Sequence, residues 1–244
     1  MTGPTSAPIR LSRPAAEFVE SVVRLHPRLA VFDCDGTLWA GDAGEQFLNW
    51  TLDRKLLPQD VDGWIRARYA DYKAGKVSEE AICGEMVTIY KGLHDGDLMR
   101  TAEEFFEAKF KAAIFPEMLE LTHRLAQAGC ELWAVSSTNE WVVRVGIRDF
   151  GIPNQNVLAA CVHIENGRAT GRLLRVPTGA DKATAVRDVI KRPADAAFGN
   201  SIHDAAMLEI ARHAFAINAN ADLQEIARQR GWTVYSPQRN LGAE

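Results

Sequence analysis

From residue 116 onward the chain alternates segments that favour a helix with short apolar segments that favour a strand. The helix-like segments are residues 116–128, 140–150, 182–190, 204–211 and 222–229. The strand-like segments are residues 131–136, 195–198, 213–217 and 232–235. Within residues 158–174 two more strand-like runs flank Asn166-Gly167, a dipeptide typical of a hairpin turn. Strands that alternate with helices predict an α/β fold with a doubly wound parallel (Rossmann-like) sheet.

The first strand of this sheet is predicted to be buried at its centre. Residues 29–32 form a continuous apolar run, as expected for a strand that is covered on both faces. Asp33 and Asp35 follow, so both carboxylates emerge at the carboxyl end of the strand, where open parallel sheets bind their ligands. Gly36 lets the chain turn away without a steric penalty. Taken alone, the motif could also be an Asp-Gly turn without further function.

The sequence changes character between this strand and the alternating region. Residues 42–115 contain no strand-like run, and their aromatic residues lie on helical segments, one of which begins at the N-cap Ser78. We interpret the aromatics as the core of a small all-helical bundle inserted after the first strand. The predicted domains are an α/β catalytic core (residues 29–41 and 116–244), a helical cap (residues 42–115), and an N-terminal extension with a helix (residues 1–28). A cap in this position would lie over the catalytic strand as a lid.

Composition excludes several classes of function. The net charge is -4 and there is no basic block, which argues against a nucleic-acid surface. No apolar run approaches the roughly 20 residues of a membrane-spanning helix. Residues 1–8 lack the features of a secretory signal, so we expect a cytoplasmic protein. The four cysteines lie far apart without Cys-x-x-Cys spacing, and they suggest neither a zinc site nor a disulfide framework.

Polar residues follow other elements on the same predicted edge of the sheet. Ser136 and Ser137 end the second strand, and Asn200 and Asp204 follow a later one. Lys182 lies in the first turn of a helix, where a cation opposes the helix dipole, and this position suggests a charged partner. Because the carboxyl ends of parallel strands meet at one edge, we expect these groups to converge with the two aspartates of the first strand.

These groups together predict a site for Mg²⁺ and phosphate. Carboxylate and amide oxygens suit Mg²⁺, which binds one or two carboxylates together with phosphate oxygens and water. Hydroxyl and ammonium groups suit the remaining phosphate oxygens. A carboxylate beside Mg²⁺ can attack phosphorus and form an aspartyl phosphate. The partner is therefore expected to be a small phosphorylated metabolite.

The order of the motifs resembles the haloacid dehalogenase-like hydrolase superfamily. The motifs are Asp33-x-Asp35-Gly36-Thr37, then Ser136 after an apolar strand, then Lys182, then Gly199-Asn200-Ser201-x-x-Asp204. The helical insertion directly after the first motif is similar to the branch that contains the phosphoserine phosphatases. The resemblance covers residues 29–236, which is nearly the whole chain.

The resemblance implies a role for each matching residue. Asp33 would be the nucleophile that takes the phosphoryl group. Asp35 would give a proton to the leaving alcohol and then activate the water that cleaves the aspartyl phosphate. Ser136, with the adjacent Ser137, and Lys182 would bind phosphate oxygens, and Lys182 would also restrain Asp33.

The expected Mg²⁺ ligands are Asp33, Asp35 through its backbone carbonyl, Asn200 and Asp204. The family usually has an aspartate directly after the glycine of the last motif, where this chain has Asn200. An amide oxygen coordinates Mg²⁺ but contributes no charge, so we expect weaker metal affinity and a larger share of the binding for Asp204.

A second departure concerns the substrate. Phosphoserine phosphatases hold the substrate carboxylate with an arginine in the cap, and the spacing from Gly75-Lys76 to Leu93 puts Met86 at that position. The acidic residue that follows their first motif is matched by Asp42. We therefore expect a phosphomonoester that need not carry a carboxylate and can carry an amine or hydroxyls. Met86 in the apolar core of the cap is the alternative.

The sequence thus predicts a Mg²⁺-dependent phosphatase that acts on a small phosphomonoester through an aspartyl phosphate. A phosphotransferase of the same superfamily stays open. A dehalogenase is disfavoured because its chemistry has no leaving alcohol for Asp35 to protonate. A non-catalytic phosphate-binding module is favoured only by Asn200. The sequence leaves the physiological substrate and the oligomeric state open.

Overall fold

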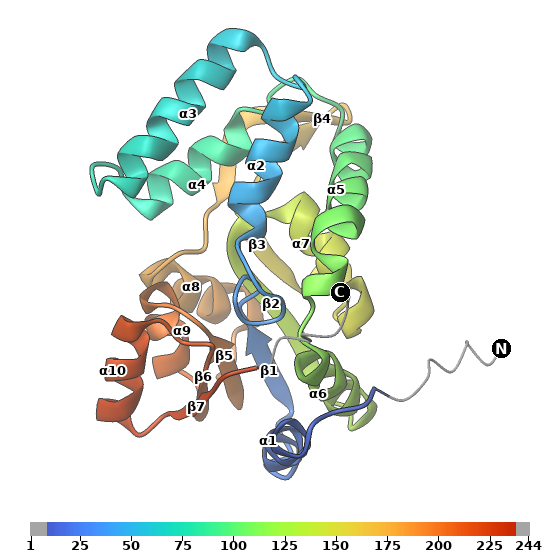
Figure 1. Cartoon of the computed structure of the whole chain (residues 1–244), viewed down its shortest axis with the longest axis vertical. Coiled ribbons are helices and arrows are strands. Elements are labelled where there is room, and N and C mark those ends of the chain that lie inside the picture. The colour runs from blue at the N-terminus through green and yellow to red at the C-terminus, as the bar shows by residue number, and fades with distance from the viewer. Residues whose placement is uncertain (1–8, 238–244) are drawn as a thin grey trace, which may run out of the picture.

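The computed structural model describes residues 9–237 and contains a seven-stranded sheet in the order β4-β3-β2-β1-β5-β6-β7 (Figure 1). The strands are β1 (Leu29–Phe32), β2 (Glu131–Asn139), β3 (Val157–Glu165), β4 (Arg168–Arg175), β5 (Ala196–Gly199), β6 (His213–Ile217) and β7 (Thr233–Tyr235). Neighbouring strands are parallel except β3 and β4, which form the antiparallel hairpin predicted at Asn166-Gly167. Both turn residues have positive φ, as a tight hairpin requires. The predicted doubly wound parallel sheet is confirmed.

Helices cover both faces of this sheet. One face packs against α1 (Arg13–Val23), α6 (Pro116–Gln127) and α7 (Glu140–Gly146), and the other against α8 (Ala180–Ala185), α9 (Ala205–Glu209) and α10 (Ala221–Arg230). Successive residues of β1 point to opposite faces, so Phe32 joins the first apolar cluster and Val31 the second. All four residues of β1 are buried, which confirms that it is a central strand. On the first face the rings of Phe32, Phe198 and Phe215 stack across β1, β5 and β6 at centroid distances of 4.4 and 4.7 Å.

The insertion after β1 is helical, as predicted. It contains α2 (Ala43–Asp53), α3 (Gln59–Lys73), α4 (Glu79–Thr88) and α5 (Asp95–Lys109), and these inserted helices lie beyond the carboxyl end of β1 (Figure 1). Asp42 and Ser78 cap α2 and α4, since each side chain accepts a hydrogen bond from a backbone amide in the first turn. Aromatic rings from α2 and α5 pack together, with the centroids of Phe47 and Phe105 at 5.3 Å.

The β3–β4 hairpin joins the sheet to the inserted helices. The amide of Gly92 donates to the carbonyl of Ala169 at 2.8 Å, and the amide of Ala169 donates to the carbonyl of Leu93 at 2.9 Å. The amide of Asp95 adds a third bond to the hairpin turn at Gly167. One corner of the inserted helices is therefore held by backbone pairing.

The predicted helix of residues 182–190 is divided in the structure. Its first part is α8, which begins at Ala180, and its second part is a π-helical turn (Val186–Ile190) that ends at Lys191 in the left-handed conformation. Similarly, the helix predicted for residues 140–150 continues after α7 as a 3₁₀ turn (Ile147–Phe150). Shorter 3₁₀ turns are Lys111–Ala113, Asn154–Asn156 and Ile202–Asp204.

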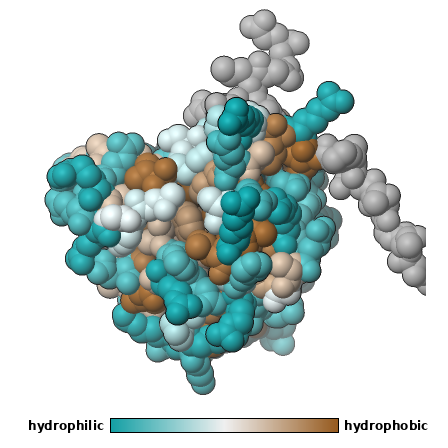
Figure 2. All heavy atoms as spheres, turned by 90° about the horizontal axis from the view of Figure 1, so that it is seen from below, coloured by the Kyte–Doolittle hydropathy of each residue, from teal (hydrophilic) through white to brown (hydrophobic). Residues whose placement is uncertain are grey.

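The surface opposite the inserted helices is mainly hydrophilic, with apolar side chains gathered in separate patches (Figure 2). No helix within residues 9–237 combines the length and the apolar character needed to cross a membrane. The N-terminal expectations for residues 1–8 fall outside the described part of the chain, as do the last seven residues of the predicted core.

Substitution of Gly146 tests the packing of α7 against Trp39 and Phe106, and substitution of Gly63 serves as the control. Gly146 at the end of α7 faces Trp39 and Phe106, and a Cβ atom there would lie 2.7 Å from both side chains. Gly146→Ala should therefore lower the free energy of unfolding by about 1–3 kcal/mol. Gly63→Ala on the open face of α3 has no neighbour within 4 Å and should raise it by about 0.5–1 kcal/mol. Urea denaturation measures both, and equal changes in the two variants would contradict the packing at Gly146.

Candidate active site

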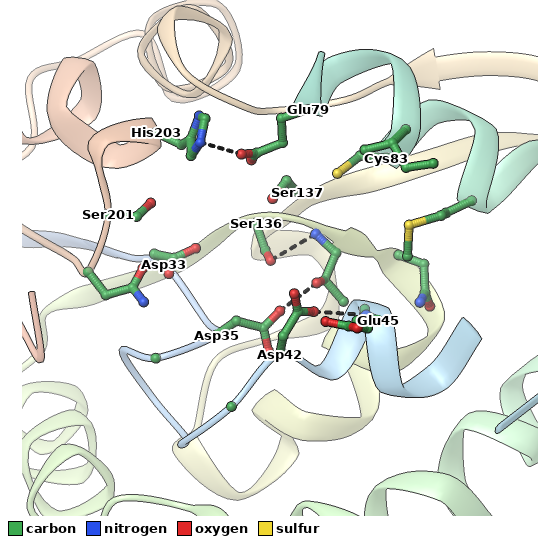
Figure 3. Close-up of a pocket in the computed structure, with 18 of the residues that line it drawn as sticks. Asp33, Asp35, Asp42, Glu45, Glu79, Cys83, Ser136, Ser137, Ser201 and His203 are labelled. Atoms are coloured by element: carbon green, nitrogen blue, oxygen red, sulfur yellow. Dashed lines mark hydrogen bonds and ion pairs between the residues drawn. The ribbon is translucent and has the colours of Figure 1, made fainter. Parts of the chain in front are cut away.

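A cavity of about 460 Å³ lies between the carboxyl ends of β1, β2 and β5 and the inserted helices. Most of the predicted site residues line it, namely Asp33, Asp35, Asp42, Met86, Ser136, Ser137, Lys182 and Asn200. In Figure 3, Glu79, His203 and Cys83 lie across this cavity from Asp33, Asp35 and Asp42. The sheet order reverses direction at β1, since β2 and β5 flank it, and ligands of open α/β sheets bind at such a switch point.

Lys182 connects Asp33 of the first motif with Asp204 of the last motif. Its Nζ atom donates to Oδ1 of Asp33 and to Oδ1 of Asp204, each at 2.6 Å. The three side chains are buried, with relative exposures of 5% for Asp33, 2% for Lys182 and 0% for Asp204. The Thr37 hydroxyl donates to the other oxygen of Asp33 at 3.1 Å. The ammonium and the hydroxyl therefore hold the Asp33 carboxylate in one orientation at the floor of the cavity.

The electrostatics of this group follow from its burial. Burial, together with the nearby Asp204 carboxylate, raises the pKa of Asp33 to about 7, against the opposing effect of Lys182. Burial by itself lowers the pKa of Lys182, but the adjacent carboxylates of Asp204 and Asp33 outweigh it and raise that pKa above its usual range. Lys182 is therefore a fixed positive charge that serves two carboxylates.

Asp35 is held by three hydrogen-bond donors. Its Oδ1 atom accepts from the indole of Trp39 at 2.6 Å and from the amide of Ala43 at 2.8 Å, and its Oδ2 atom accepts from the Thr138 hydroxyl at 2.5 Å. Burial raises the pKa of Asp35 in spite of these donors. A carboxyl group with a raised pKa, fixed beside the nucleophile candidate, is suited to proton transfer. Sequence reasoning missed Thr138, because nothing in one sequence pairs it with a residue on another strand.

Ser136 and Ser137 lie at the end of β2, where the register with β3 shifts between Ser136 and Asn139. The Ser136 hydroxyl is buried and accepts a hydrogen bond from the amide of Thr138 at 3.2 Å. The irregular strand end thus places Ser136 and Ser137 in the lining of the cavity that also contains Asp33, where hydroxyl groups could bind phosphate oxygens.

Asn200 and Asp204 lie in the loop that follows β5, but they occupy different positions. Asn200 lines the cavity next to Gly36, where a Cβ atom would lie 2.0 Å from the Asn200 amide nitrogen. Asp204 lies behind Lys182: its Oδ2 atom accepts from the amides of Asn200 and Ser201 at 2.9 and 3.0 Å, and its Oδ1 atom accepts from Lys182. As placed, Asp204 organises the loop and the ammonium, and its role as a metal ligand stays a prediction.

The donor set fits Mg²⁺. Within residues 9–237 no group of three or more His, Cys, Asp or Glu side chains is arranged to hold a metal ion. Carboxylate, amide and backbone oxygens, together with phosphate or water oxygens, are ligands that Mg²⁺ accepts. The cavity floor offers such oxygens through Asp33, the Asp35 segment and Asn200.

The side of the cavity formed by the inserted helices carries residues that sequence reasoning missed. Glu79 in the first turn of α4 accepts a hydrogen bond from Thr178 at 2.6 Å and pairs with His203 of the loop after β5 at 2.5 Å. Burial alone would raise the pKa of Glu79, but its hydrogen bonds with His203 and Thr178 lower it. The hydrogen bond to Glu79 raises the pKa of His203. Glu79 thus connects the inserted helices to the core beside the cavity.

The sequence matches a known protein family. The model of the haloacid dehalogenase-like hydrolase family matches residues 30–209. A phosphoserine phosphatase of Mycobacterium tuberculosis is 27% identical over 215 residues, which cover 84% of this chain and 69% of that protein. A histidinol-phosphatase of Neisseria meningitidis serogroup C is 23% identical over 217 residues, which cover 84% of this chain and 97% of that protein.

Solved structures share the fold. A protein of unknown function from Bordetella pertussis Tohama I superposes with a TM-score of 0.75 at 23% identity, covering 85% of this chain and 97% of that one. A substrate-bound phosphoserine phosphatase superposes with a TM-score of 0.60 at 17% identity, covering 88% of this chain and 94% of that one.

The buried charges around Lys182 predict a stability effect. Lys182→Met leaves two buried carboxylates without their cation and should lower the free energy of unfolding by about 3–5 kcal/mol when no divalent cation is present. Because the pKa of Asp33 is raised in the folded state, stability is lost as pH rises above the unfolded-state pKa. The decrease in the free energy of unfolding caused by Lys182→Met should therefore be smaller near about pH 5 than near about pH 8.

The control for this prediction is the double variant Asp33→Asn/Lys182→Met, which removes one carboxylate together with the cation. It should be more stable than Lys182→Met in urea denaturation at about pH 8. A double variant that is no more stable would mean that charge repulsion between Asp33 and Asp204 does not cause the loss.

Proposed function

Because the chain belongs to the haloacid dehalogenase-like hydrolase family, we propose that it is a Mg²⁺-dependent phosphatase that hydrolyses a small phosphomonoester through an aspartyl phosphate. One observation carries the proposal: Asp33, Asp35, Ser136 and Lys182 line one cavity at the switch point of the sheet, with Lys182 2.6 Å from Asp33. The names of the phosphoserine phosphatase and histidinol-phosphatase relatives support a phosphomonoester as the substrate.

In the proposed reaction an oxygen of Asp33 attacks phosphorus, the ester bond between phosphorus and the leaving oxygen breaks, and Asp35 gives its proton to that oxygen. A water molecule then gives a proton to Asp35 and attacks the aspartyl phosphate, and the bond between phosphorus and Asp33 breaks. Lys182 and Ser136 bind the phosphate oxygens, and their positions on rigid elements keep the phosphorus in line with Asp33.

Asp35 must begin this cycle with a proton. Burial raises its pKa, which supports that role, and the hydrogen bonds from Trp39, Ala43 and Thr138 fix the orientation of the carboxyl group while they oppose this rise. A dehalogenase would have no alcohol to protonate, so the presence of a second buried carboxyl group with a raised pKa beside Asp33 favours a phosphatase.

The residues that would hold Mg²⁺ are Asp33, Asp35 through its backbone carbonyl, and Asn200. Asp204 would act mainly by holding Lys182 and the loop that carries Asn200. When bound there, Mg²⁺ supplies positive charge that stabilises the transferring phosphoryl group.

We further propose that residues 42–115 act as a cap over a core formed by residues 29–41 and 116–244. The inserted helices supply one wall of the cavity, so they enclose the leaving group while the sheet supplies the reacting groups. This arrangement separates chemistry from substrate choice.

Asp33→Asn should abolish turnover, because an amide cannot form the aspartyl phosphate. The measurement is release of inorganic phosphate from an aryl phosphate with Mg²⁺, with circular dichroism to verify folding. Easily measured activity in the folded variant would remove Asp33 from the role of nucleophile.

A separate experiment on the parent protein distinguishes hydrolysis from phosphotransfer. With an acceptor alcohol present, production of the free alcohol without an equivalent amount of inorganic phosphate would indicate phosphotransfer.

Asp35→Asn should lower kcat by about 10²–10⁴-fold, the usual contribution of a general acid or base. The loss should be smaller for an aryl phosphate than for an alkyl phosphate, because a phenolate leaves without a proton more readily. Equal losses for the two esters would argue against proton donation by Asp35.

Asn200→Asp should lower the Mg²⁺ concentration that gives half of the maximal rate, because it adds a negative charge to the metal site. The matched control is Asn49→Asp, which adds the same charge at an exposed position of α2. An unchanged Mg²⁺ requirement in Asn200→Asp would mean that Asn200 is not a ligand.

A further inference from the structure

The cavity extends beyond the reacting groups to a wall formed by Asp42, Glu45, Tyr69 and Tyr72, which we call the acidic aromatic wall. We propose that this wall binds an ammonium group on the substrate, so that the enzyme acts on phosphate esters of amino alcohols that lack a carboxylate. The inference rests on the proposed phosphatase function and specifies its substrate class.

The two tyrosines provide faces that suit a cation. Both lie on α3, they are half-buried, and their ring centroids are 5.7 Å apart with the planes inclined by 56°. An ammonium near such rings is attracted by their negative faces, and the attraction grows when water is excluded. Each ring therefore offers a surface that attracts an ammonium more strongly than a neutral or anionic group of similar size.

The ammonium of Lys73, on the same helix, already lies beside this wall. Its Nζ atom lies 5.2 Å from the ring centroid of Tyr69, 6.0 Å from that of Tyr72 and 3.4 Å from Oε2 of Glu45. The Lys73 side chain is 57% exposed, so it covers the wall from the solvent side and does not line the cavity. A substrate ammonium approaching from the cavity side would meet the same rings and carboxylates.

The charges of the cavity favour a cation and disfavour a carboxylate. Of its two basic lining residues, Lys182 is paired with Asp33 and Asp204, and His203 is paired with Glu79. No arginine is among the described residues that line the cavity. Asp42 lines it as well, and no ion pair of Asp42 is found within residues 9–237. A substrate carboxylate would therefore find no unpaired cationic side chain among the described residues that line the cavity.

The remaining wall is apolar and comes from α4. Ile82, Cys83, Met86 and Val87 line the cavity and present no cation that could hold a carboxylate. Met86, which the spacing predicts at the position of the carboxylate-binding arginine of phosphoserine phosphatases, is thus a wall residue. Carbon atoms of the leaving group can pack on this surface, and the water they displace strengthens the attraction between the ammonium and the acidic aromatic wall.

The test compares esters that differ only in charge. 2-Aminoethyl phosphate carries an ammonium, 2-hydroxyethyl phosphate replaces it with a hydroxyl group of similar size, and O-phosphoserine adds a carboxylate. We expect kcat/KM for 2-aminoethyl phosphate to exceed both others by about tenfold or more, which corresponds to about 1.4 kcal/mol. Equal or lower kcat/KM for the amino ester would overturn the inference.

Variants locate the effect. Glu45→Gln and Tyr69→Leu should each reduce the ratio of kcat/KM for the amino ester to that for the hydroxy ester by about fivefold or more. The matched control is Glu80→Gln, which removes an exposed carboxylate from the first turn of α4 and should leave the ratio unchanged. Ratios that stay at the parental value in both wall variants would place the amine elsewhere and overturn the inference.

A binding measurement tests the ammonium site independently of the proposed phosphatase reaction. If no ester is hydrolysed, an aryl phosphate included, the phosphatase proposal fails. Isothermal titration calorimetry of the parent protein with the same three esters then ranks their affinities, and Glu45→Gln repeats the comparison. Tighter binding of the amino ester that is lost in Glu45→Gln supports the wall as an ammonium site, and equal affinities overturn it.

Discussion

The bond pattern of Lys182 is the constraint on which the rest of the site depends. One ammonium lies between two buried carboxylates, and one of them, Asp33, is 149 residues away in the chain. Without the cation, two acids would face one another in a region with little water, which costs several kcal/mol. The helix that carries Lys182, the strand that precedes Asp33 and the loop that ends at Asp204 must therefore fold together. Asp204 also accepts hydrogen bonds from the backbone amides of Asn200 and Ser201. The ion pair that holds Asp204 therefore also orders the cavity floor near Asn200.

Much of the core could be predicted because its signals are local. A continuous apolar run identified β1 as a buried strand, and Asn166-Gly167 identified the hairpin. The order of the motifs along the chain suggested which residues line the cavity, and the structure brings most of them together. The contacts between Thr138 and Asp35, and between Glu79 and His203, could not be predicted in this way. Each joins segments far apart in sequence, and their geometry depends on strand register and helix placement that no local pattern encodes. The position of Asp204 behind Lys182 was missed for the same reason: spacing shows that a residue is near a site but not which way its oxygens face.

The two parts of the structure divide the work of the proposed enzyme. The sheet supplies groups that any phosphate ester requires, and it holds them with bonds that leave little freedom. In the proposed reaction the side chains of the inserted helices that line the cavity would meet the leaving group. A change in α2, α3 or α4 can therefore alter which ester is accepted without disturbing the Asp33–Lys182 pair. This proposed separation is consistent with relatives whose names refer to different phosphatases, a phosphoserine phosphatase and a histidinol-phosphatase.

The β3–β4 hairpin gives the inserted helices an asymmetric attachment. At one corner, backbone hydrogen bonds between residues 92–95 and 167–169 tie them to the sheet. Beside the cavity, contacts of the Glu79 side chain with Thr178 and His203 connect them to the core. Side-chain contacts of this kind break and re-form more easily than a backbone ladder. We therefore expect the contacts of Glu79 to break before the backbone hydrogen bonds of the hairpin corner when an ester enters the cavity.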